Sequence, residues 1–240
     1  DTSSLKLMIS SGAMFTTEVK RGLIDHVPEL AIADVLGSTE GGMGQSIMTK
    51  DTPPSETAKF TLLPVAKVLL PDGSREVVPG SGEVGMVAQG GMVPLGYYKD
   101  PEKSAKTFKE IDGTRYAFIG DMATIDADGT INLLGRGSNC INTGGEKVFP
   151  EEVEEALKLH PDVADALVFG LEDERFGNRV AGVVSLEQGG TAEAGDILET
   201  TRKLLASYKL PKDLRVVPVV PRAPNGKADY KTAKSMMADG

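Results

Sequence analysis

Residues 31–42 read Ala-Ile-Ala-Asp-Val-Leu-Gly-Ser-Thr-Glu-Gly-Gly, an apolar run that ends in a glycine-rich segment. An apolar run bounded by turn residues is typical of a buried strand. Upstream, residues 5–10 form a second apolar run, and residues 16–26 have the pattern of a helix. Thr16 can cap that helix, and Glu18 in its first turn suits the helix dipole. A strand, a helix and a strand in this order predict the end of an α/β sheet whose strand tips face a ligand.

The next part of the chain consists of short apolar runs separated by frequent turns. The turn Asp-Ala-Asp-Gly at residues 126–129 joins two such runs, and it lacks the remaining ligands of a calcium-binding loop. Asp100 and Pro101 fit the cap and the first position of a short helix. Short strands with frequent turns predict a small, mostly antiparallel, barrel-like unit. Its expected strands cover residues 62–70, 83–88, 115–119, 122–126 and 130–134.

The pattern changes again near Asn139. Pro150 begins a helix whose apolar residues recur at helical spacing, and Thr191 is the expected cap of another helix that extends to about residue 208. A helix, two strands, a helix and a strand predict a compact α+β domain. The apolar face of the first helix carries Val153, Ala156 and Leu157, and the expected strands cover residues 163–169, 180–186 and 214–220.

The sequence therefore predicts a chain of mixed α/β and α+β class with two domains. We expect residues 1–138 to form the first domain, with an α/β portion over residues 1–57 and a β-rich portion over residues 58–138. Residues 139–240 are expected to form the second domain. Because the chain begins with Asp1 and an apolar run almost at once, we expect it to be a piece of a larger protein.

Charge and composition argue against several classes of protein. The 240 residues include 26 Lys plus Arg and 35 Asp plus Glu, for a net charge of −9, whereas general nucleic-acid binding needs a positive field. No apolar stretch is long enough for a transmembrane segment, and no signal peptide is visible. A single cysteine, Cys140, and two histidines cannot build a disulfide framework or a multi-cysteine metal site. We therefore expect a cytoplasmic protein without a nucleic-acid partner.

Two segments of the first domain suggest a nucleotide site. We expect residues 37–44 to form a loop, in which glycines let backbone N–H groups approach an anion. Within it, a hydroxyl of Ser38 or Thr39 can contact a phosphate, and the Glu40 carboxylate can hold Mg²⁺. Asp121, at the end of an expected strand, can accept both hydroxyls of a ribose. Taken singly, a surface loop and an ordinary turn aspartate are equally plain interpretations.

Two further segments carry candidates, one that spans the expected domain boundary and one in the second domain. Arg136 could bind a sugar or a phosphate, and the glycines of residues 144–147, Gly-Gly-Glu-Lys, could let a narrow substrate arm pass the backbone. The plainer alternative is a flexible interdomain loop. Residues 224–227, Pro-Asn-Gly-Lys, put the Lys227 ammonium at the tip of an expected mobile loop, where it could face a carboxylate or phosphate. The alternative is a solvated lysine.

In this order and at these spacings, the segments resemble the adenylate-forming enzymes, which include acyl-CoA synthetases, peptide-synthetase adenylation domains and firefly-type luciferases. The resemblance covers nearly the whole chain. Residues 11–14, with Gly12 and Ala13, are similar to the family's acyl-site loop, and Gly37, Ser38, Thr39 and Glu40 are similar to its phosphate and magnesium loop. Residues 96–98 with Pro101 fit a further block. Asp121 and Arg136 resemble the ribose-binding pair, and Asn139 resembles the hinge. The segment with Gly144, Gly145, Glu146, Lys147, Pro150 and Glu154 resembles the lid loop, and Lys227 resembles the catalytic lysine.

The resemblance implies an ATP-dependent, AMP-forming acid–thiol ligase that uses ATP, Mg²⁺ and coenzyme A. The acid attacks the α-phosphate of ATP, with Lys227 between the acid and the phosphate, Thr39 on phosphate and Glu40 on Mg²⁺. Asp121 and Arg136 would fix the ribose. The second domain would then rotate about Asn139, so that Gly144 and Gly145 face the pantetheine arm for attack by the thiol.

The chain also departs from the family's pattern. Leu36 stands where the family usually has an aromatic residue that packs on adenine. Asn139 replaces a frequent aspartate at the hinge, and Ser138 replaces a frequent lysine before it. The family's lysine-containing triphosphate loop has no counterpart in these residues. We therefore expect that the 240 residues alone do not turn over substrate.

The sequence of residues 10–15 and of residues 36–42 is similar to that of actinobacterial-type ligases for fatty acids or steroid side-chain acids. One alternative is an adenylation enzyme that transfers to a carrier-protein thiol, and a luciferase-like oxygenase is a further one. Another alternative, of a different class, is a non-catalytic fragment that binds a nucleotide or a partner. If apolar surface is exposed on the first domain, self-association of the chain is possible.

Overall fold

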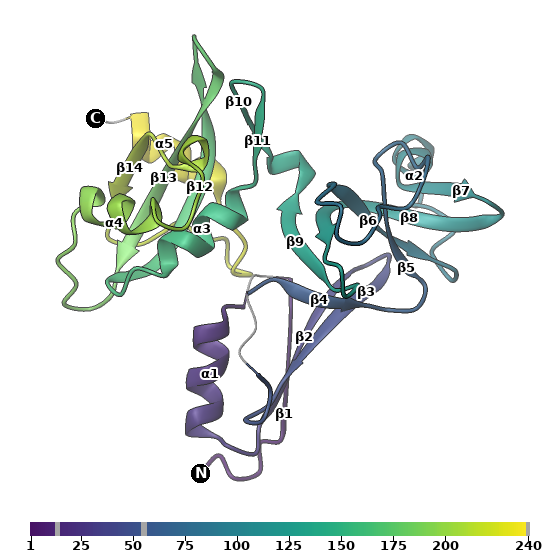
Figure 1. Cartoon of the computed structure of the whole chain (residues 1–240), viewed down its shortest axis with the longest axis horizontal. Helices are drawn as coiled ribbons and strands as arrows, with labels where there is room; N and C mark the ends of the chain where they lie inside the picture. Colours follow the sequence, from purple (N-terminus) through teal and green to yellow (C-terminus); the bar gives the residue numbers. More distant parts are fainter. Residues whose placement is uncertain (13–14, 54–56, 239–240) are drawn as a thin grey trace. The chain divides into compact units, whose positions relative to one another are not determined.

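The computed structural model describes residues 1–12, 15–53 and 57–238 (Figure 1). Contacts within the chain divide it into two compact units, Asp1–Leu134 and Gly135–Gly240. Both units combine strands and helices, which confirms the predicted fold class of mixed α/β and α+β. Among the described residues, no helix is both long enough and apolar enough to cross a membrane.

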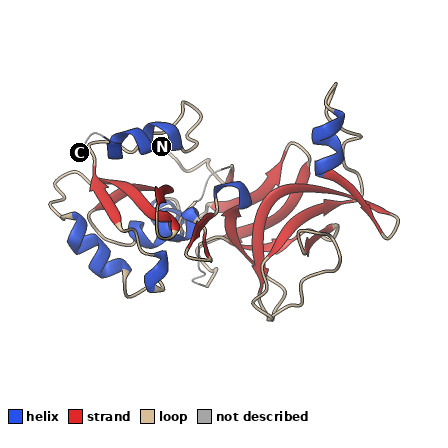
Figure 2. Cartoon of the chain, turned by 90° about the horizontal axis from the view of Figure 1, so that it is seen from above, coloured by secondary structure: helices blue, strands red, loops and turns tan. Residues whose placement is uncertain are grey.

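The first unit is built on a single sheet of nine strands. Its order is β1-β2-β3-β4-β9-β8-β6-β5, and β7 pairs with β8 beside this path. The β-rich strands are antiparallel, as predicted, and they curve strongly (Figure 2). The two ends of the path do not pair with each other within the described ranges, so the sheet is open. The strands are β1 Leu7–Ser11, β2 Ala31–Ser38, β3 Gly41–Met48, β4 Lys59–Leu62, β5 Ala66–Leu69, β6 Gly85–Gly90, β7 Phe108–Ile111, β8 Thr114–Ile125 and β9 Ile131–Arg136.

The predicted strand–helix–strand unit at the start of the chain is present. Helix α1, Thr17–His26, begins after Thr16, whose side chain accepts a hydrogen bond from the Val19 N–H, and it connects the parallel strands β1 and β2. Ile24 packs with Ile32 on the side of the sheet that α1 covers. A buried ion pair, with 2.7 Å between Lys20 Nζ and Asp34 Oδ2, also joins α1 to β2.

The opposite side of these strands is apolar and exposed. Side chains alternate along a strand, so Leu7 and Ile9 of β1 point away from the side on which Met8 packs with Ile32. Ile9 pairs with Ala33 on β2, which pairs with Ile47 on β3, and the three therefore share one row across the sheet. Ile9 is 67% exposed and Ile47 is 54% exposed.

The predicted loop over residues 37–44 is wrong. Strand β2 continues to Ser38 and β3 begins at Gly41, so only Thr39 and Glu40 form the turn of a hairpin. Glycine was interpreted as a sign of a loop, but here glycines allow the two strands to approach closely. A Cβ atom at Gly37 would lie 3.3 Å from the carbonyl oxygen of Gly41.

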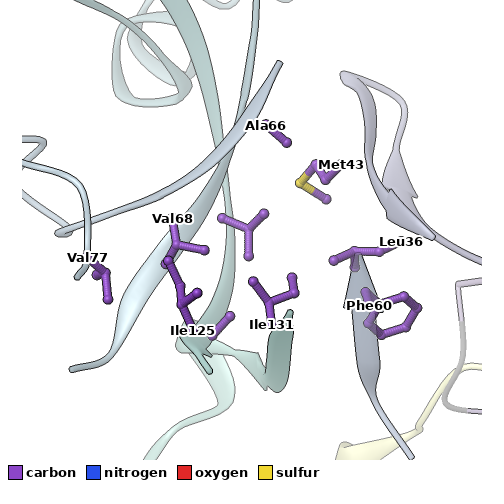
Figure 3. Packing of buried hydrophobic residues seen from close by; sticks show 10 residues of the cluster. Leu36, Met43, Phe60, Ala66, Val68, Val77, Ile125 and Ile131 are labelled. Atoms are coloured by element: carbon purple, nitrogen blue, oxygen red, sulfur yellow. The ribbon is translucent and has the colours of Figure 1, made fainter. Parts of the chain in front are cut away.

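The core of the first unit lies between strands that are distant in sequence (Figure 3). Buried side chains from β2 to β6, β8 and β9 contribute, together with Val77 from the loop before β6. Because β4 pairs with both β3 and β9, the expected portions over residues 1–57 and 58–138 share one sheet. The cluster contains Leu36, Met43, Phe60, Ala66, Val68, Val77, Val87, Ala123, Ile125 and Ile131.

Several predicted strand bounds need correction. The strand expected over residues 62–70 corresponds to β5, which is shorter, whereas β4 was not predicted. Between the two strands the chain turns, and the Ala66 N–H donates to the Leu63 carbonyl. The two strands expected over residues 115–119 and 122–126 are one long strand, β8. The predicted turn that follows is confirmed, since the Gly129 N–H donates to the Asp126 carbonyl.

The second unit has a five-stranded sheet with helices on both faces. Helix α3 buries its predicted apolar face against alternate residues of β12 and β13, and α4 packs on the same side. Helix α5 packs through Ala233 on the other side. The strand order is β11-β10-β13-β12, and β14 pairs with β13. The elements are β10 Ile141–Thr143, β11 Glu146–Val148, α3 Pro150–Lys158, β12 Val163–Asp173, β13 Gly177–Leu186, α4 Ala194–Thr201, β14 Asp213–Val216 and α5 Tyr230–Ala238, with 3₁₀ turns Gly137–Asn139 and Ser207–Lys209.

Helix α4 differs from its prediction at both ends. Its N-cap is Glu193, not Thr191, and a capping box joins Glu193 to Asp196. The Thr191 N–H instead donates to Asp162, which holds the preceding loop. The helix ends at Thr201, so the expected continuation to residue 208 is wrong.

Candidate functional site

Glu40, a predicted Mg²⁺ ligand, lies in the two-residue turn between β2 and β3. Its backbone N–H donates to Ser38 Oγ at 3.1 Å, and the Tyr97 hydroxyl donates to its carboxylate. Partial burial raises the pKa of Glu40, but the hydrogen bonds from Ser38 and Tyr97 outweigh this effect and hold the pKa below its ordinary value. Glu40 is therefore ionised at neutral pH and suited to a cation or a hydrogen-bond donor.

Tyr97 belongs to the block of residues 96–98 noted in the sequence, but no role in the site was predicted for it. Helix α2, Pro101–Thr107, starts after the predicted cap Asp100 and places Ser104, whose Oγ accepts from the Tyr97 N–H at 2.7 Å. The Tyr97 ring lies 5.5 Å from the Phe108 ring, and Lys103 Nζ lies 4.0 Å from its centroid. The contact between Tyr97 and Glu40 spans 57 residues, which no local pattern indicates.

The tip of the β2–β3 hairpin is packed against strand β6. Gly41 has a φ of +153°, and a Cβ atom there would lie 2.8 Å from Cγ of Gln89. Close packing on a neighbouring side chain therefore requires glycine at this position. Thr39, the predicted phosphate contact, is exposed at the same tip.

Asp121, the predicted ribose ligand, lies in an irregular part of β8. Met86 pairs with Met122 and Ala88 pairs with Phe118, so Val87 alone faces residues 119–121. Gly120 within this bulge has a φ of +95°. A bulge redirects side chains and is frequent beside functional sites. Asp121 is only 7% exposed.

Two further positions bear on the predicted nucleotide and acyl sites. Leu36 is 7% exposed and belongs to the core cluster with Met43 and Phe60, so its side chain is not available to pack on adenine (Figure 3). Gly12 is exposed, with a φ of +82°, just beyond β1. Ala13 lies outside the described residues.

Gly144 and Gly145 form the tip of the β10–β11 hairpin. Their φ angles of +59° and +91° match a type I′ turn, which requires left-handed backbone at both central residues. The segment is therefore an ordered hairpin, and the alternative of a flexible interdomain loop is not supported. The Gly144 N–H donates to the carbonyl of Phe176 at 3.0 Å, which ties the tip to the start of β13. The next residues, Glu146 and Lys147, are exposed.

Arg136 is the last residue of β9 and is exposed. The backbone N–H of Arg136 donates to Oε1 of Glu151 at 3.4 Å, and Glu151 lies in the first turn of α3. Gly135 has a φ of +121°, a backbone conformation that favours glycine, and a Cβ atom there would displace the Glu151 carboxylate.

Lys227 lies in a tight turn that two backbone hydrogen bonds close. The Ala223 N–H donates to the Lys227 carbonyl, and the Gly226 N–H donates to the Ala223 carbonyl, both at 2.8 Å. Gly226 has a φ of +79°, as the third residue of a Pro-Asn-Gly turn allows. The Lys227 side chain is exposed and makes no ion pair among the described residues.

The predicted residues divide between the two units. Gly37, Ser38, Thr39 and Glu40 share one hairpin in the first unit. The glycine hairpin, Asn139 and the Lys227 turn belong to the second unit.

A magnesium site at Glu40 agrees with this donor set. The described residues contain no cluster of three or more His, Cys, Asp or Glu side chains that could hold a metal unaided. Mg²⁺ commonly binds one or two carboxylates and completes its shell with water and substrate phosphates, and one ionised carboxylate fits that mode.

Comparison with known proteins agrees with this architecture. Residues 152–227 match the model of the AMP-binding enzyme C-terminal domain. The chain is 46% identical over 237 residues to a medium/long-chain-fatty-acid–CoA/3-oxocholest-4-en-26-oate–CoA ligase of Mycolicibacterium smegmatis, covering 98% of this chain and 43% of the relative. It is also 46% identical to a 3-oxocholest-4-en-26-oate–CoA ligase of Rhodococcus rhodochrous, covering 98% of this chain and 42% of the relative.

Solved structures show the same fold. ATP-bound MatB from Rhodopseudomonas palustris superposes with a TM-score of 0.78 at 27% identity, over 97% of this chain and 46% of that chain. The chain spans less than half the length of the curated relatives that it matches. Residues 152–227 thus match the AMP-binding enzyme C-terminal domain, and nearly the whole chain is similar to part of the two CoA ligases and of MatB.

Proposed function

We propose that this chain forms the C-terminal part of an acyl-CoA ligase, which activates a carboxylic acid with ATP and transfers the acyl group to coenzyme A. The observation that carries the proposal is Lys227, an exposed ammonium on a hydrogen-bonded turn with no ion pair among the described residues. Such a group is available to a ligand and is fixed by its backbone.

In the first step, a carboxylate oxygen of the acid attacks the α-phosphate of ATP. The bond from this phosphorus to the bridging oxygen of pyrophosphate breaks, which gives the acyl-adenylate. Lys227 would offset the negative charge that the acid and the α-phosphate bring together. Thr39 would contact phosphate, and Asp121 and Arg136 would fix the ribose and so align the α-phosphate. Bound Mg²⁺ supplies positive charge to the phosphate oxygens, and Glu40 is the residue that would hold it.

In the second step, the thiol of coenzyme A attacks the carbonyl carbon of the adenylate and AMP leaves. Gly144 and Gly145 would let the pantetheine arm pass close to the backbone, with Glu146 and Lys147 beside it. Asn139 would be the hinge at which the second unit turns between the two steps. We propose both the role of Asn139 as the hinge and a domain boundary near this residue.

The acid is proposed to be a fatty acid or a steroid side-chain acid, because the relatives from Mycolicibacterium smegmatis and Rhodococcus rhodochrous carry those substrates in their names. Gly12 and Ala13 would line the acyl site. The single cysteine agrees with a proposed place in the cytoplasm. We propose that the 240 residues alone do not turn over substrate.

The test is ATP- and CoA-dependent AMP release by a polypeptide of the relatives' length that carries this chain, with short, long and steroid-type acids. Lys227→Ala should slow adenylate formation by about 10²–10³-fold, a typical loss for one group that stabilises charge in the transition state. Lys203→Ala, another exposed lysine of the second unit, is the matched control and should match wild type.

Three outcomes would count against parts of the proposal. Adenylate without thioester would point to a carrier-protein acceptor. A normal rate for Lys227→Ala would remove the role of that lysine. If no acid is activated at all, a non-catalytic binding fragment becomes the better interpretation.

A further inference from the structure

The turn that carries Lys227 is closed at its base by contacts of the backbone. Arg222 and Ala228 form an antiparallel bridge, and the Asp229 N–H donates to the Pro221 carbonyl at 3.2 Å. These contacts join the two arms of the turn to each other and so fix its shape. They do not set the direction in which the turn points from the sheet of the second unit.

Apolar packing holds the start of the turn against that sheet. Val220, just before the turn, is 3% exposed and belongs to the same apolar cluster as Leu167 and Phe169 of β12. Because apolar burial is non-directional, this packing keeps the base of the turn on the sheet but leaves its orientation to other contacts.

The directional contact is an ion pair between Arg222 and Asp165 of β12. Arg222 Nη2 lies 2.6 Å from Asp165 Oδ1, and Arg222 Nε lies 2.9 Å from Asp165 Oδ2. Nη2 also donates to the Ala166 carbonyl at 3.3 Å. The carboxylate is itself held on the strand, since its Oδ1 accepts the Ala166 N–H at 2.8 Å. A guanidinium bound at two points is fixed in both position and orientation.

We propose that Arg222 and Asp165 are positioning residues, which aim the Lys227 ammonium through this two-point ion pair at the base of its turn. The inference rests on the proposed function, in which Lys227 serves adenylate formation. Only residues 223–226 lie between Arg222 and Lys227, so a tilt of the base moves the ammonium as well. The two charges of the pair offset each other, and its contribution is therefore orientation.

The consequence concerns one partial reaction more than the other. Loss of the guanidinium leaves the backbone contacts of the turn and the packing of Val220 in place, but it removes the directional tie to β12. The Lys227 ammonium then samples a wider range of positions, and alignment in the first step suffers. The proposed second step uses the glycine hairpin and not Lys227, so its rate should change much less.

The first experiment measures both partial reactions in the polypeptide of the relatives' length. Arg222→Ala and Asp165→Ala should each slow adenylate formation by about tenfold, less than Lys227→Ala, because the ammonium is present but poorly aligned. The double variant should lose no more than either single variant, since the two residues act through one contact. Transfer from a supplied acyl-adenylate to CoA should change less than about twofold.

Two further variants separate orientation from charge and from folding. Arg222→Lys keeps the positive charge but cannot form the two-point pair, so it should slow adenylate formation as Arg222→Ala does, even if the alanine variant is poorly folded. The matched control is Arg179→Ala, which should leave adenylate formation at the wild-type rate. Arg179 Nε lies 2.6 Å from Asp213 Oδ2, and its Nη1 donates to the Glu172 carbonyl at 2.7 Å, so the same kinds of contact are lost outside the lysine turn.

A second comparison tests whether Arg222 acts through Lys227. In a Lys227→Ala background, Arg222→Ala should cause no further loss, because no ammonium is left to aim. A further loss of similar size would mean that Arg222 contacts ATP or the acid itself, and it would overturn the positioning role.

A measurement that does not need turnover keeps the two proposals separate. The N–H groups of Ala223 and Asp229 are hydrogen-bonded on either side of the bridge between Arg222 and Ala228, and their hydrogen exchange reports on opening of the base. Arg222→Ala should speed exchange at both positions, and Arg179→Ala at neither. Unchanged exchange, or equal losses in the two partial reactions, would overturn the proposal. Faster exchange in a polypeptide that activates no acid would keep the tie and reject the proposed ligase function.

Discussion

Glu154 is a carboxyl group that α3 places inside the second unit, where it is 8% exposed. Its Oε1 accepts a hydrogen bond from the Val168 N–H at 2.9 Å, which joins the helix to β12. Burial raises the pKa of Glu154 to about 8, and the hydrogen bond from Val168 opposes this only in part. At neutral pH, the folded protein therefore holds this carboxyl in its protonated form.

The raised pKa predicts a dependence of stability on pH. Below its ordinary value of 4.5, Glu154 is protonated in both the folded and the unfolded state. As pH rises from there to about 8, only the unfolded state releases the proton, so stability falls by up to about 1.4 kcal/mol per pH unit from this group. Glu154→Gln keeps the acceptor for Val168 but carries no proton to lose, so we expect this decline to disappear. The measurement is the urea midpoint of the wild type and of Glu154→Gln from pH 5 to pH 9. If the two midpoints change with pH in parallel, the prediction is contradicted.

Single residues were predictable where the signal is local. Thr16 and Asp100 cap their helices as expected, because a cap depends on residues within one turn. The interaction of Glu40 with Tyr97 joins residues far apart in sequence. Spacing within a motif carries no information on such contacts, and only the folded chain shows them.

At the scale of elements, the β10–β11 hairpin allows a test of the second partial reaction. Gly145 has a φ of +91°, and a Cβ atom there would contact nothing within 4 Å. Gly145→Ala should therefore cost about 1 kcal/mol of stability through backbone strain alone. It should also slow thioester formation and leave adenylate formation near wild type, because the methyl group would narrow the proposed path of the pantetheine arm. Separate assays of the two partial reactions and a urea midpoint measure these effects.

The control for that experiment is Gly129→Ala. Gly129 has a φ of +86° in another hairpin turn, with no atom near its missing Cβ. The two substitutions should cost similar stability, and only Gly145→Ala should affect the thioester step. If both variants behave alike in both assays, the glycine hairpin has no special part in acyl transfer.

Helices and strands were predicted well where the apolar periodicity was strong. They were predicted poorly where contacts with distant parts of the chain determine their bounds. The apolar face of α3 follows from its spacing, and Val153 and Leu157 are fully buried as expected. Helix α5, Tyr230–Ala238, was not predicted, because it packs on the sheet through few residues, chiefly Ala233. Strand β8 was divided in two because the bulge at Gly120 resembles a turn in the sequence.

At the scale of the whole molecule, the order of strands could not be read from the sequence. Strand β4 pairs with β3 on one side and with β9 on the other, which brings residues 59 and 132 together. The division into α/β and β-rich portions follows composition, but the hydrogen bonds of β4 join both portions into one sheet. Composition shows which kind of layer a segment prefers, whereas pairing of distant strands depends on the complete core.

The apolar row on the side of β1 to β3 opposite α1 predicts how the isolated 240 residues behave. Sheets with parallel strands are usually covered on both faces, yet Leu7, Ile9 and Ile47 are each more than half exposed here. A second copy can cover this row by placing its own row against it, and burial of such side chains is worth about 25 cal/mol per Å² of apolar surface. We therefore predict that the isolated chain self-associates through these residues. Sedimentation at increasing concentration should show dimers, and Ile9→Lys should shift the chain to monomers. Leu95→Lys, at an exposed leucine elsewhere in the first unit, should leave association unchanged, and a wild-type chain that stays monomeric at high concentration would refute the prediction.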